Sequence, residues 1–241
     1  MDQFTVVDQL GAGAFGRALL CRDKSTREFV VIKEIRCADK AARDEARREA
    51  ELLRKHSHPN VCRLIASFSS DEHKRFYLVL EHCDGGDLSQ SIAKRRSERN
   101  PYKENEAAAI FVMITLALRH VHARRIVHRD VKASNIMLSK SDDSAVLIDL
   151  GLAVRLQAPE PGTALAAVTS YQSELRCGVP GYMAPEQFLG HKVDARTDVY
   201  ALGVLLYECL TGRLPHQAPT IVALASRVLG QDPAPPSRFV P

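Results

Sequence analysis

The sequence predicts an α+β fold in two parts, a small antiparallel β-rich lobe with one main helix and a larger, mostly helical lobe. Three observations lead to this prediction. Short β-type runs dominate the first third of the chain, helical periodicity dominates most of the rest, and Gly85-Gly86 interrupts the pattern between them. We expect the small lobe at residues 4–82 and the larger lobe at 83–241, with a ligand site in the cleft between them.

The composition is that of an ordinary folded protein, since 45% of the 241 residues are hydrophobic and 26% are charged. The formal net charge of +4 is small, so we expect no nucleic-acid partner. No apolar run reaches the ~18 residues of a membrane span, and the N-terminus lacks the pattern of a signal peptide. None of the six cysteines forms a Cys-x-x-Cys pair. We therefore expect reduced thiols, a cytoplasmic location and no membrane partner.

The β-rich part is expected to contain five short strands and one long helix. Turn residues separate the strand candidates, whereas the helix candidate is rich in Ala, Arg, Glu and Leu. The expected strands lie at 4–10, 18–22, 29–35, 61–67 and 76–81, and the helix lies at 39–56.

The remainder of the chain is expected to be mainly helical. Residues 156–176 are rich in Ala, Pro, Ser and Thr without a period, which predicts a long surface loop, and such loops are often functional. The Pro-rich tail at 231–241 is expected to be irregular. Helices are predicted at 88–96, 105–122 and 199–210, a buried strand at 145–148 and a mixed, charged segment at 127–138.

A glycine-rich motif, Gly11-Ala12-Gly13-Ala14-Phe15-Gly16, joins the first two strand candidates. Glycine lets the backbone close over phosphate groups without Cβ clashes. A dinucleotide-binding fold would require a helix after the glycines, but residues 18–22 have the pattern of a strand. The motif therefore predicts a β-hairpin that covers the phosphates of a nucleotide.

The segment Val30-Val31-Ile32-Lys33 places a lysine at the end of a buried strand. A buried charge needs a partner, and the candidate is Glu49 on the predicted helix. The alternative is that Glu49 is one of several charges on a solvated helix face. If Glu49 is the partner of Lys33, then Lys33 holds the α- and β-phosphates of the nucleotide, and Glu49 orients Lys33.

The motifs that follow resemble those of eukaryotic-type protein kinases, in the same order, from Gly11 to about Gly212. The resemblance implies a bilobal kinase fold that transfers the γ-phosphate of ATP to serine or threonine of protein substrates, with Mg²⁺. The hinge Cys-Asp-Gly-Gly-Asp-Leu and the leucine at position 150 are similar to NIMA-related kinases. The further motifs are His128-Arg129-Asp130, Asn135, Asp149-Leu150-Gly151, Ala184-Pro185-Glu186 and Asp198.

The resemblance assigns catalytic roles to residues of the segment 128–135 and to Asp149. Asp130 would orient the substrate hydroxyl, and Lys132 would neutralise charge on the moving phosphoryl group. Asn135 and Asp149 would supply oxygen ligands to Mg²⁺. Arg129, Leu150, Glu186 and Asp198 are expected to be regulatory or structural positions.

The resemblance also outlines an adenine site. Backbone groups of 81–83 would bond the adenine edge, and Leu80 would control access behind it. Asp87 would meet the ribose or a basic substrate residue, or else cap a helix together with Gln90, and both interpretations stay open. Glu81, Cys83, Ala18, Val31 and Met137 complete the expected ATP-binding residues.

Two positions around adenine depart from the family pattern. Kinases normally carry Val after the glycines and Ala before the lysine's neighbour, but here these positions are Ala18 and Val31. The apolar volume has changed sides, and volume-conserving exchanges are the best tolerated.

The activation segment departs as well, because Val179 replaces the Thr of Gly-Thr-Pro and cannot make its hydrogen bond. We therefore expect Val179 to lower the activity relative to kinases that carry the Thr. Arg129 indicates a loop that responds to negative charge, although Leu175 occupies the usual phosphosite. The nearest candidates are Thr169, Ser170, Tyr171, Ser173 and the fixed charge of Glu174.

The resemblance finally implies further helices after Leu229, including an arginine that pairs with Glu186. We therefore expect a C-terminally truncated lobe, no partner for Glu186 and an uncovered face on the helix 199–210. Low stability is expected unless an activating or covering protein, or sequence missing from this chain, covers that face. The leading hypothesis is an active kinase, by resemblance associated with the cytoskeleton. The alternative is a weakly active or inactive pseudokinase that binds ATP or a protein. The segment 184–186 disfavours a small-molecule phosphotransferase.

Overall fold

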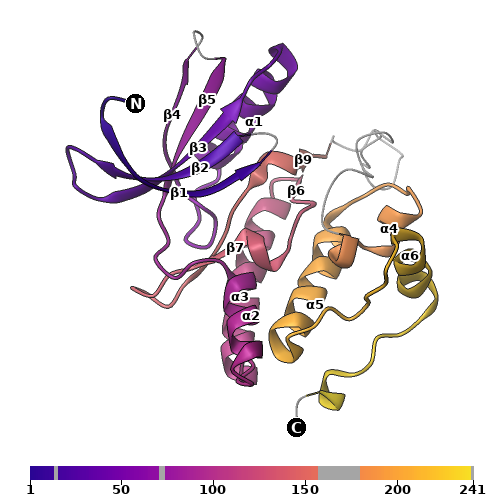
Figure 1. Cartoon of the computed structure of the whole chain (residues 1–241). Helices are drawn as coiled ribbons and strands as arrows, with labels where there is room; N and C mark the ends of the chain where they lie inside the picture. The colour runs from indigo at the N-terminus through magenta and orange to yellow at the C-terminus, as the bar shows by residue number, and fades with distance from the viewer. Residues whose placement is uncertain (14–15, 71–73, 157–179, 240–241) are drawn as a thin grey trace. The chain divides into compact units, whose positions relative to one another are not determined.

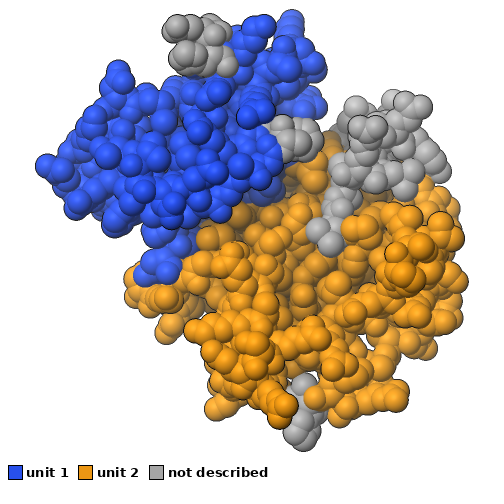
Figure 2. Space-filling model, in the orientation of Figure 1, with its two compact units in different colours: residues 1–84, 149–151 blue, residues 85–148, 152–241 orange. Residues whose placement is uncertain are grey.

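The computed structural model describes residues 1–13, 16–70, 74–156 and 180–239. The chain divides into two compact units, coloured separately in Figure 2. Unit 1 comprises Met1–Asp84 together with Asp149–Gly151, and unit 2 comprises Gly85–Ile148 and Leu152–Pro241. The main division falls close to the expected boundary at residue 82. The sequence pattern did not indicate that residues 149–151 return to unit 1.

Unit 1 is built on a five-stranded antiparallel sheet with the strand order β1-β2-β3-β5-β4 (Figure 1). The fourth strand begins at Leu64, later than expected, because Val61 N–H closes a turn onto the His58 carbonyl at 3.0 Å. The strands are β1 (Phe4–Gly13), β2 (Gly16–Asp23), β3 (Phe29–Arg36), β4 (Leu64–Ser70) and β5 (Arg75–Glu81).

The strand register separates the sheet into two chemically different faces. Ala18 lies opposite Lys33, and Val31 lies opposite Leu80. Because side chains alternate along a strand, these four predicted site residues share one face. The other face carries an apolar core against which Phe4 and Phe68 pack, and its members are Leu19, Cys21, Val30, Ile32, Tyr77 and Val79.

The helix of unit 1, α1 (Lys40–Lys55), agrees with the prediction for residues 39–56. The Asp39 carboxylate accepts a hydrogen bond from Ala42 N–H at 2.8 Å and so caps the helix. Arg54 and Lys55 lie in the last turn, where positive charge favours the helix dipole. The buried face consists of Ala46, Glu49, Ala50 and Leu53, with the spacing of an amphipathic helix.

Unit 2 is mostly helical, and α3 packs against α5 (Figure 1). Two small antiparallel pairs join the helices, β6 (Ile126–Val127) with β9 (Val154–Arg155), and β7 (Ile136–Leu138) with β8 (Ala145–Leu147). The predicted α+β class is therefore confirmed. The helices are α2 (Leu88–Ser97), α3 (Glu104–His122), α4 (Pro185–Phe188), α5 (Ala195–Thr211) and α6 (Ile221–Gly230).

Two of these helices, α4 and α6, were not predicted. Helix α4 has only four residues, too few to show a period. In α6 only Leu224 is buried, whereas Val222 is 76% exposed, so this helix contributes little to the core. As far as residue 239, where the description ends, the tail contains a single 3-10 turn, Pro236–Arg238, and is otherwise irregular, as expected. In the described ranges no helix is both long and apolar enough to cross a membrane.

Helix α5 is more covered than the sequence predicted. Ala201, Leu202, Val204 and Leu205 are buried. Among the large hydrophobic residues that α5 carries, Val199 is the exposed one, at 58%. The predicted uncovered face is thus confined to the neighbourhood of this residue.

Candidate active site

Lys33 lies at the centre of an ion-pair cluster in unit 1. Its Nζ lies 2.8 Å from Glu49 Oε1 and 2.8 Å from Asp149 Oδ1. Burial by itself would lower the pKa of Lys33, but the two carboxylates outweigh burial and raise the pKa above its ordinary value. The lysine is therefore held as a positively charged donor. The structure contains the expected pair with Glu49, whereas the contact with Asp149 was not expected.

Gly151 lies against this cluster of carboxylates, where a Cβ atom would make tight contacts. A Cβ atom at Gly151 would lie 3.0 Å from Asp149 Oδ1 and 3.3 Å from Glu49 Oε2. Gly151 N–H also donates to Asp149 Oδ1 at 3.2 Å, and Asp149 itself has a φ of 65°. The intervening Leu150 is buried, so its side chain anchors the turn.

The glycines of the hairpin differ in what they require. A Cβ at Gly16 would lie 1.8 Å from the Glu34 carbonyl oxygen, and the φ of Gly16 is 152°, so the fold itself demands glycine there. A Cβ at Gly11 or Gly13 would meet no described atom within 4 Å. This open space fits the close approach of a ligand phosphate. Ala12 pairs with Arg17 in the hairpin, whereas Ala14 and Phe15 lie outside the described residues.

In unit 2 the two oxygens of the buried Asp130 carboxylate have different surroundings. Oδ2 accepts hydrogen bonds from Lys132 Nζ at 2.7 Å and from Asn135 Nδ2 at 2.8 Å. Asn135 Nδ2 also donates to the Asp130 carbonyl oxygen at 2.8 Å. Oδ1 is buried and receives no hydrogen bond from any residue that the structure describes. One oxygen is thus fixed by its neighbours, and the other is left for a further donor.

Asp198, at the start of α5, holds the backbone before Asp130. Its Oδ2 accepts a hydrogen bond from His128 N–H at 2.8 Å, and its Oδ1 accepts one from Arg129 N–H at 2.8 Å. His122 Nε2 lies 2.7 Å from the same Oδ2. These contacts stabilise Arg129 at a φ of 66°, an uncommon value for a side-chain-bearing residue. The Arg129 side chain donates to the Leu152 carbonyl oxygen at 2.7 Å.

The expected adenine-binding residues are divided between the two units. In unit 1, Glu81 N–H donates to the Arg63 carbonyl at 3.1 Å, so what Glu81 could offer adenine is its own carbonyl oxygen. Leu80 precedes it in β5, and Cys83 is buried. In unit 2, Asp87 and Met137 form a β-bridge.

Asp87 is the N-cap of α2. Its Oδ1 accepts hydrogen bonds from Gln90 N–H at 2.9 Å and from the Ser89 hydroxyl at 2.5 Å. The helix-cap interpretation is therefore confirmed. The role at the ribose or at a substrate residue stays a prediction.

The expectation that Glu186 lacks a partner was wrong. The Thr197 hydroxyl, from the first turn of α5, donates to Glu186 Oε1 at 2.7 Å. The sequence argument considered only an arginine, because it looked for an opposite charge. A neutral hydroxyl satisfies a carboxylate oxygen as well and has no sequence signature of its own.

Sequence reasoning also missed Tyr182 and Glu208. The Tyr182 hydroxyl accepts a hydrogen bond from Ala133 N–H at 3.2 Å and donates one to the Glu208 carboxylate. Burial raises the pKa of both side chains. The available signal was that Glu208 interrupts an otherwise apolar helix. Through Tyr182, α5 is thus connected to the backbone three residues after Asp130.

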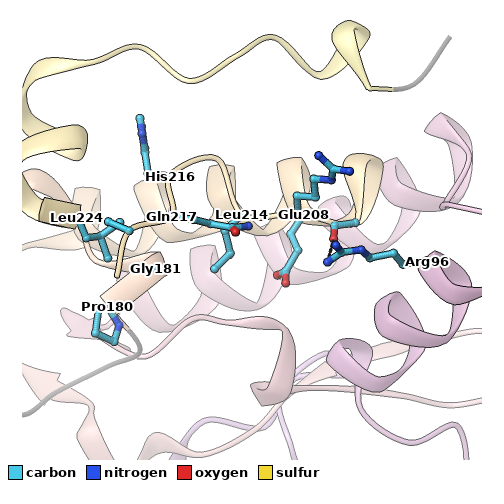
Figure 3. A pocket seen from close by; sticks show the side chains of 11 residues that line it. Arg96, Pro180, Gly181, Glu208, Leu214, His216, Gln217 and Leu224 are labelled. Carbon is cyan, nitrogen blue, oxygen red and sulfur yellow. Dashed lines mark hydrogen bonds between the residues drawn. The ribbon is translucent and has the colours of Figure 1, made fainter. Parts of the chain in front are cut away.

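Glu208 also borders a pocket of about 480 Å³ in unit 2. Figure 3 shows Glu208 and Leu214 between Arg96 at one end and Leu224 at the other. Pro180 and Gly181, the first described residues after position 179, line the same pocket. The expected positions 169–171, 173–175 and 178–179 lie outside the described residues.

The donor atoms available to a metal are those that Mg²⁺ prefers. Asn135 uses its Nδ2 for both of its side-chain hydrogen bonds to Asp130, and its amide oxygen accepts none from a described residue. Asp149 provides a carboxylate. Among residues of known placement, no group of three or more His, Cys, Asp or Glu side chains is placed to hold a metal. Mg²⁺ commonly binds through one or two protein ligands and substrate phosphates, and each of these residues, Asn135 in unit 2 and Asp149 in unit 1, offers an oxygen of the kind that Mg²⁺ prefers.

Comparisons with known proteins identify the family of this chain. The sequence model of the family described as "Protein kinase domain" matches residues 4–231. The chain is 35% identical to human "Serine/threonine-protein kinase Nek5" and covers 30% of its length, with 95% of this chain aligned. It is 35% identical to mouse "Serine/threonine-protein kinase Nek3" (90% of this chain, 40% of the relative). It is 30% identical to "Serine/threonine-protein kinase pkn3" of Myxococcus xanthus (99% and 43%).

The chain therefore belongs to the protein kinase domain family, and its predicted resemblance to NIMA-related kinases is confirmed. The bilobal kinase fold that the resemblance implied is confirmed with it. The chain spans less than half the length of each of these three relatives.

Proposed function

We propose that this chain transfers the γ-phosphate of ATP to serine or threonine hydroxyls of protein substrates. The observation that carries the proposal is the buried Asp130 Oδ1, which no described residue satisfies, beside an Oδ2 that Lys132 and Asn135 fix. A buried acceptor without a donor is costly. A substrate hydroxyl would supply the missing hydrogen bond and would be oriented by it for attack. The kinase names of the relatives support the same activity.

The other residues of the site take complementary roles in this proposal. Lys33, kept charged by its two carboxylate neighbours, would hold the α- and β-phosphates. Lys132 would neutralise charge on the transferred phosphoryl group. Asn135 and Asp149 would hold Mg²⁺, which, when bound, neutralises phosphate charge.

The pocket beside Pro180 is the proposed contact for part of the protein substrate. It lies in the same unit as Asp130 and is connected to Ala133 by the hydrogen bonds of Tyr182 and Glu208. A segment of polypeptide that enters it would therefore be positioned by the helix that also anchors the catalytic loop.

Regulation and location are part of the proposal. A negative charge in the segment 169–174 would interact with the positive charge of Arg129 and so regulate activity. A protein partner would activate the chain or cover its exposed apolar surface. No disulfide joins the cysteines that the structure describes, which supports a reducing compartment such as the cytoplasm. Mass spectrometry of active protein that finds no phosphate in residues 156–176 would exclude the phosphorylation part.

The central test is phosphate transfer from γ-labelled ATP to a generic basic protein. Asp130→Asn is expected to reduce transfer by about 10²–10⁴-fold. The amide oxygen would accept from Lys132 and Asn135, so that an NH2 donor would replace the open acceptor for the substrate hydroxyl. Asp143→Asn, the same substitution at an exposed position, is the matched control and should leave transfer unchanged. A wild-type chain that binds ATP yet transfers no more phosphate than Asp130→Asn would instead indicate the pseudokinase alternative.

A further inference from the structure

Glu34, the residue directly after Lys33, is a buried carboxylate held by two arginines. Its exposed fraction is 3%. Arg17 on β2 binds it with both ends of the guanidinium fork, Nε to Oε1 at 3.0 Å and Nη2 to Oε2 at 3.2 Å. Arg75 on β5 donates Nη1 to Oε2 at 2.9 Å. One carboxylate thus connects three adjacent strands, β2, β3 and β5.

The two arginines hold different parts of unit 1. Arg17 follows Gly16, the last glycine of the hairpin, and lies directly opposite Glu34 in the β2–β3 register. Gly16 itself is so close to the Glu34 carbonyl that a Cβ atom could not fit. Main chain and side chain therefore attach the same end of the hairpin to the same residue. Arg75 begins β5 and does not belong to the hairpin.

This attachment restricts the conformational freedom of the glycine-rich hairpin. Three glycines within Gly11–Gly16 give the backbone more conformational freedom than other residues would, and ordering them costs entropy. A bidentate, charge-assisted contact fixes geometry better than a single hydrogen bond. The Arg17–Glu34 pair supplies such a contact at the point where the glycines end.

We propose that Arg17 and Glu34 are positioning residues that fix the glycine hairpin relative to Lys33 and thereby set the affinity for nucleotide phosphates. The inference rests on the proposed function, in which the hairpin covers those phosphates. Alternation along β2 and β3 places both side chains on the sheet face opposite to Ala18 and Lys33. They therefore act through the backbone and do not touch the nucleotide.

The test compares two variants of the whole chain, Arg17→Gln and Arg75→Gln. Each leaves Glu34 with one arginine, and both side chains are partly exposed, so their effects on thermal stability should be similar. Binding of adenosine and of ADP with Mg²⁺ is measured by calorimetry. Arg17→Gln is expected to weaken ADP binding by about two- to fivefold, the range of one partly exposed ion pair, without changing adenosine binding. Arg75→Gln should change neither.

Arg17→Lys separates geometry from charge. Lysine keeps the positive charge but cannot form the bidentate contact, so a positioning role predicts an ADP affinity between those of wild type and Arg17→Gln. Equal ADP binding by wild type and Arg17→Gln, equal losses in Arg17→Gln and Arg75→Gln, or full recovery in Arg17→Lys would each overturn the inference. A wild-type chain that binds neither adenosine nor ADP would count against the proposed function itself.

Discussion

Asp130 and Glu34 show how two buried carboxylates take different roles. Both carboxylate oxygens of Glu34 accept hydrogen bonds from arginine side chains. Asp130 has donors on Oδ2, whereas its Oδ1 receives none from the described residues. A carboxylate with donors on both oxygens suits a residue that holds strands together. A carboxylate with one open acceptor suits a residue that receives a substrate hydroxyl. The sequence pattern identified Asp130 but could not show which of its oxygens is open.

Some residues of the candidate site could be predicted individually from the sequence, and others only as members of a group. Lys33, Asp130 and Asn135 could be named because they stand in motifs with fixed spacing. Glu49 could be named only as one of several charges on its helix. Its choice depends on which face of α1 packs on the sheet, and a local pattern does not contain that information.

Ala18 and Val31 give a prediction at the scale of single side chains. The register makes them diagonal neighbours on the face that carries Lys33. Ala18→Val is expected to crowd the adenine and to weaken ATP binding by about tenfold, the effect of modest overpacking. The double variant Ala18→Val with Val31→Ala restores the total volume and should bind ATP nearly as wild type does. Equal ATP affinities in the single and double variants, measured by calorimetry, would refute this compensation.

Helix α5 is the element that holds the segment around Asp130 in place. Asp198 in its first turn holds the backbone of His128 and Arg129, and Glu208 in its last turns holds Tyr182. Ten residues separate the two, about three helical turns, so one rigid rod fixes both contacts. The period of apolar residues predicted the helix itself. Its polar contacts were not predictable, because their partners lie far away in the sequence.

Glu208 provides a pH-dependent prediction for this helix. Burial raises the pKa of Glu208 above its ordinary value of 4.5, so ionisation costs the folded state more than the unfolded chain. The contribution of protonated Glu208 to the free energy of unfolding is therefore complete below pH 4.5, and it is lost as the pH rises through the raised pKa. Glu208→Gln lacks this loss. Its melting temperature relative to wild type is therefore expected to rise by a few degrees between about pH 4 and about pH 7.5.

The control for this experiment is Glu104→Gln, which changes an exposed glutamate on α3. Its melting temperature relative to wild type should stay nearly constant over the same range. A difference between Glu208→Gln and wild type that does not change with pH would contradict the prediction.

For the whole molecule, the contact between Lys33 and Asp149 joins positions 116 residues apart. Segment 149–151 thereby belongs to unit 1, although the rest of the chain after Asp84 belongs to unit 2. Unfolding destroys this arrangement, so a nucleotide that binds it stabilises the native chain.

The corresponding prediction concerns thermal unfolding with ADP and Mg²⁺. At about 100 times Kd the ligand adds about 2.7 kcal/mol to the unfolding free energy, a rise of about 5–10 °C in a chain of this size. Lys33→Met should lose most of the rise, because it removes the charged donor. A melting temperature that ADP does not change in the wild-type chain would contradict the proposed nucleotide site.

By itself the sequence determined the class of fold, the long elements and the residues that could carry phosphate transfer. Those features are written in local periodicity and in motifs of fixed spacing. The tertiary structure alone decided that Thr197 satisfies Glu186, that Tyr182 and Glu208 support the catalytic loop, and that Glu34 is clamped by two arginines. The physical reason is that a hydrogen bond or ion pair between distant residues depends on how elements pack, and hydroxyls and surface charges are too common in a sequence to reveal their partners.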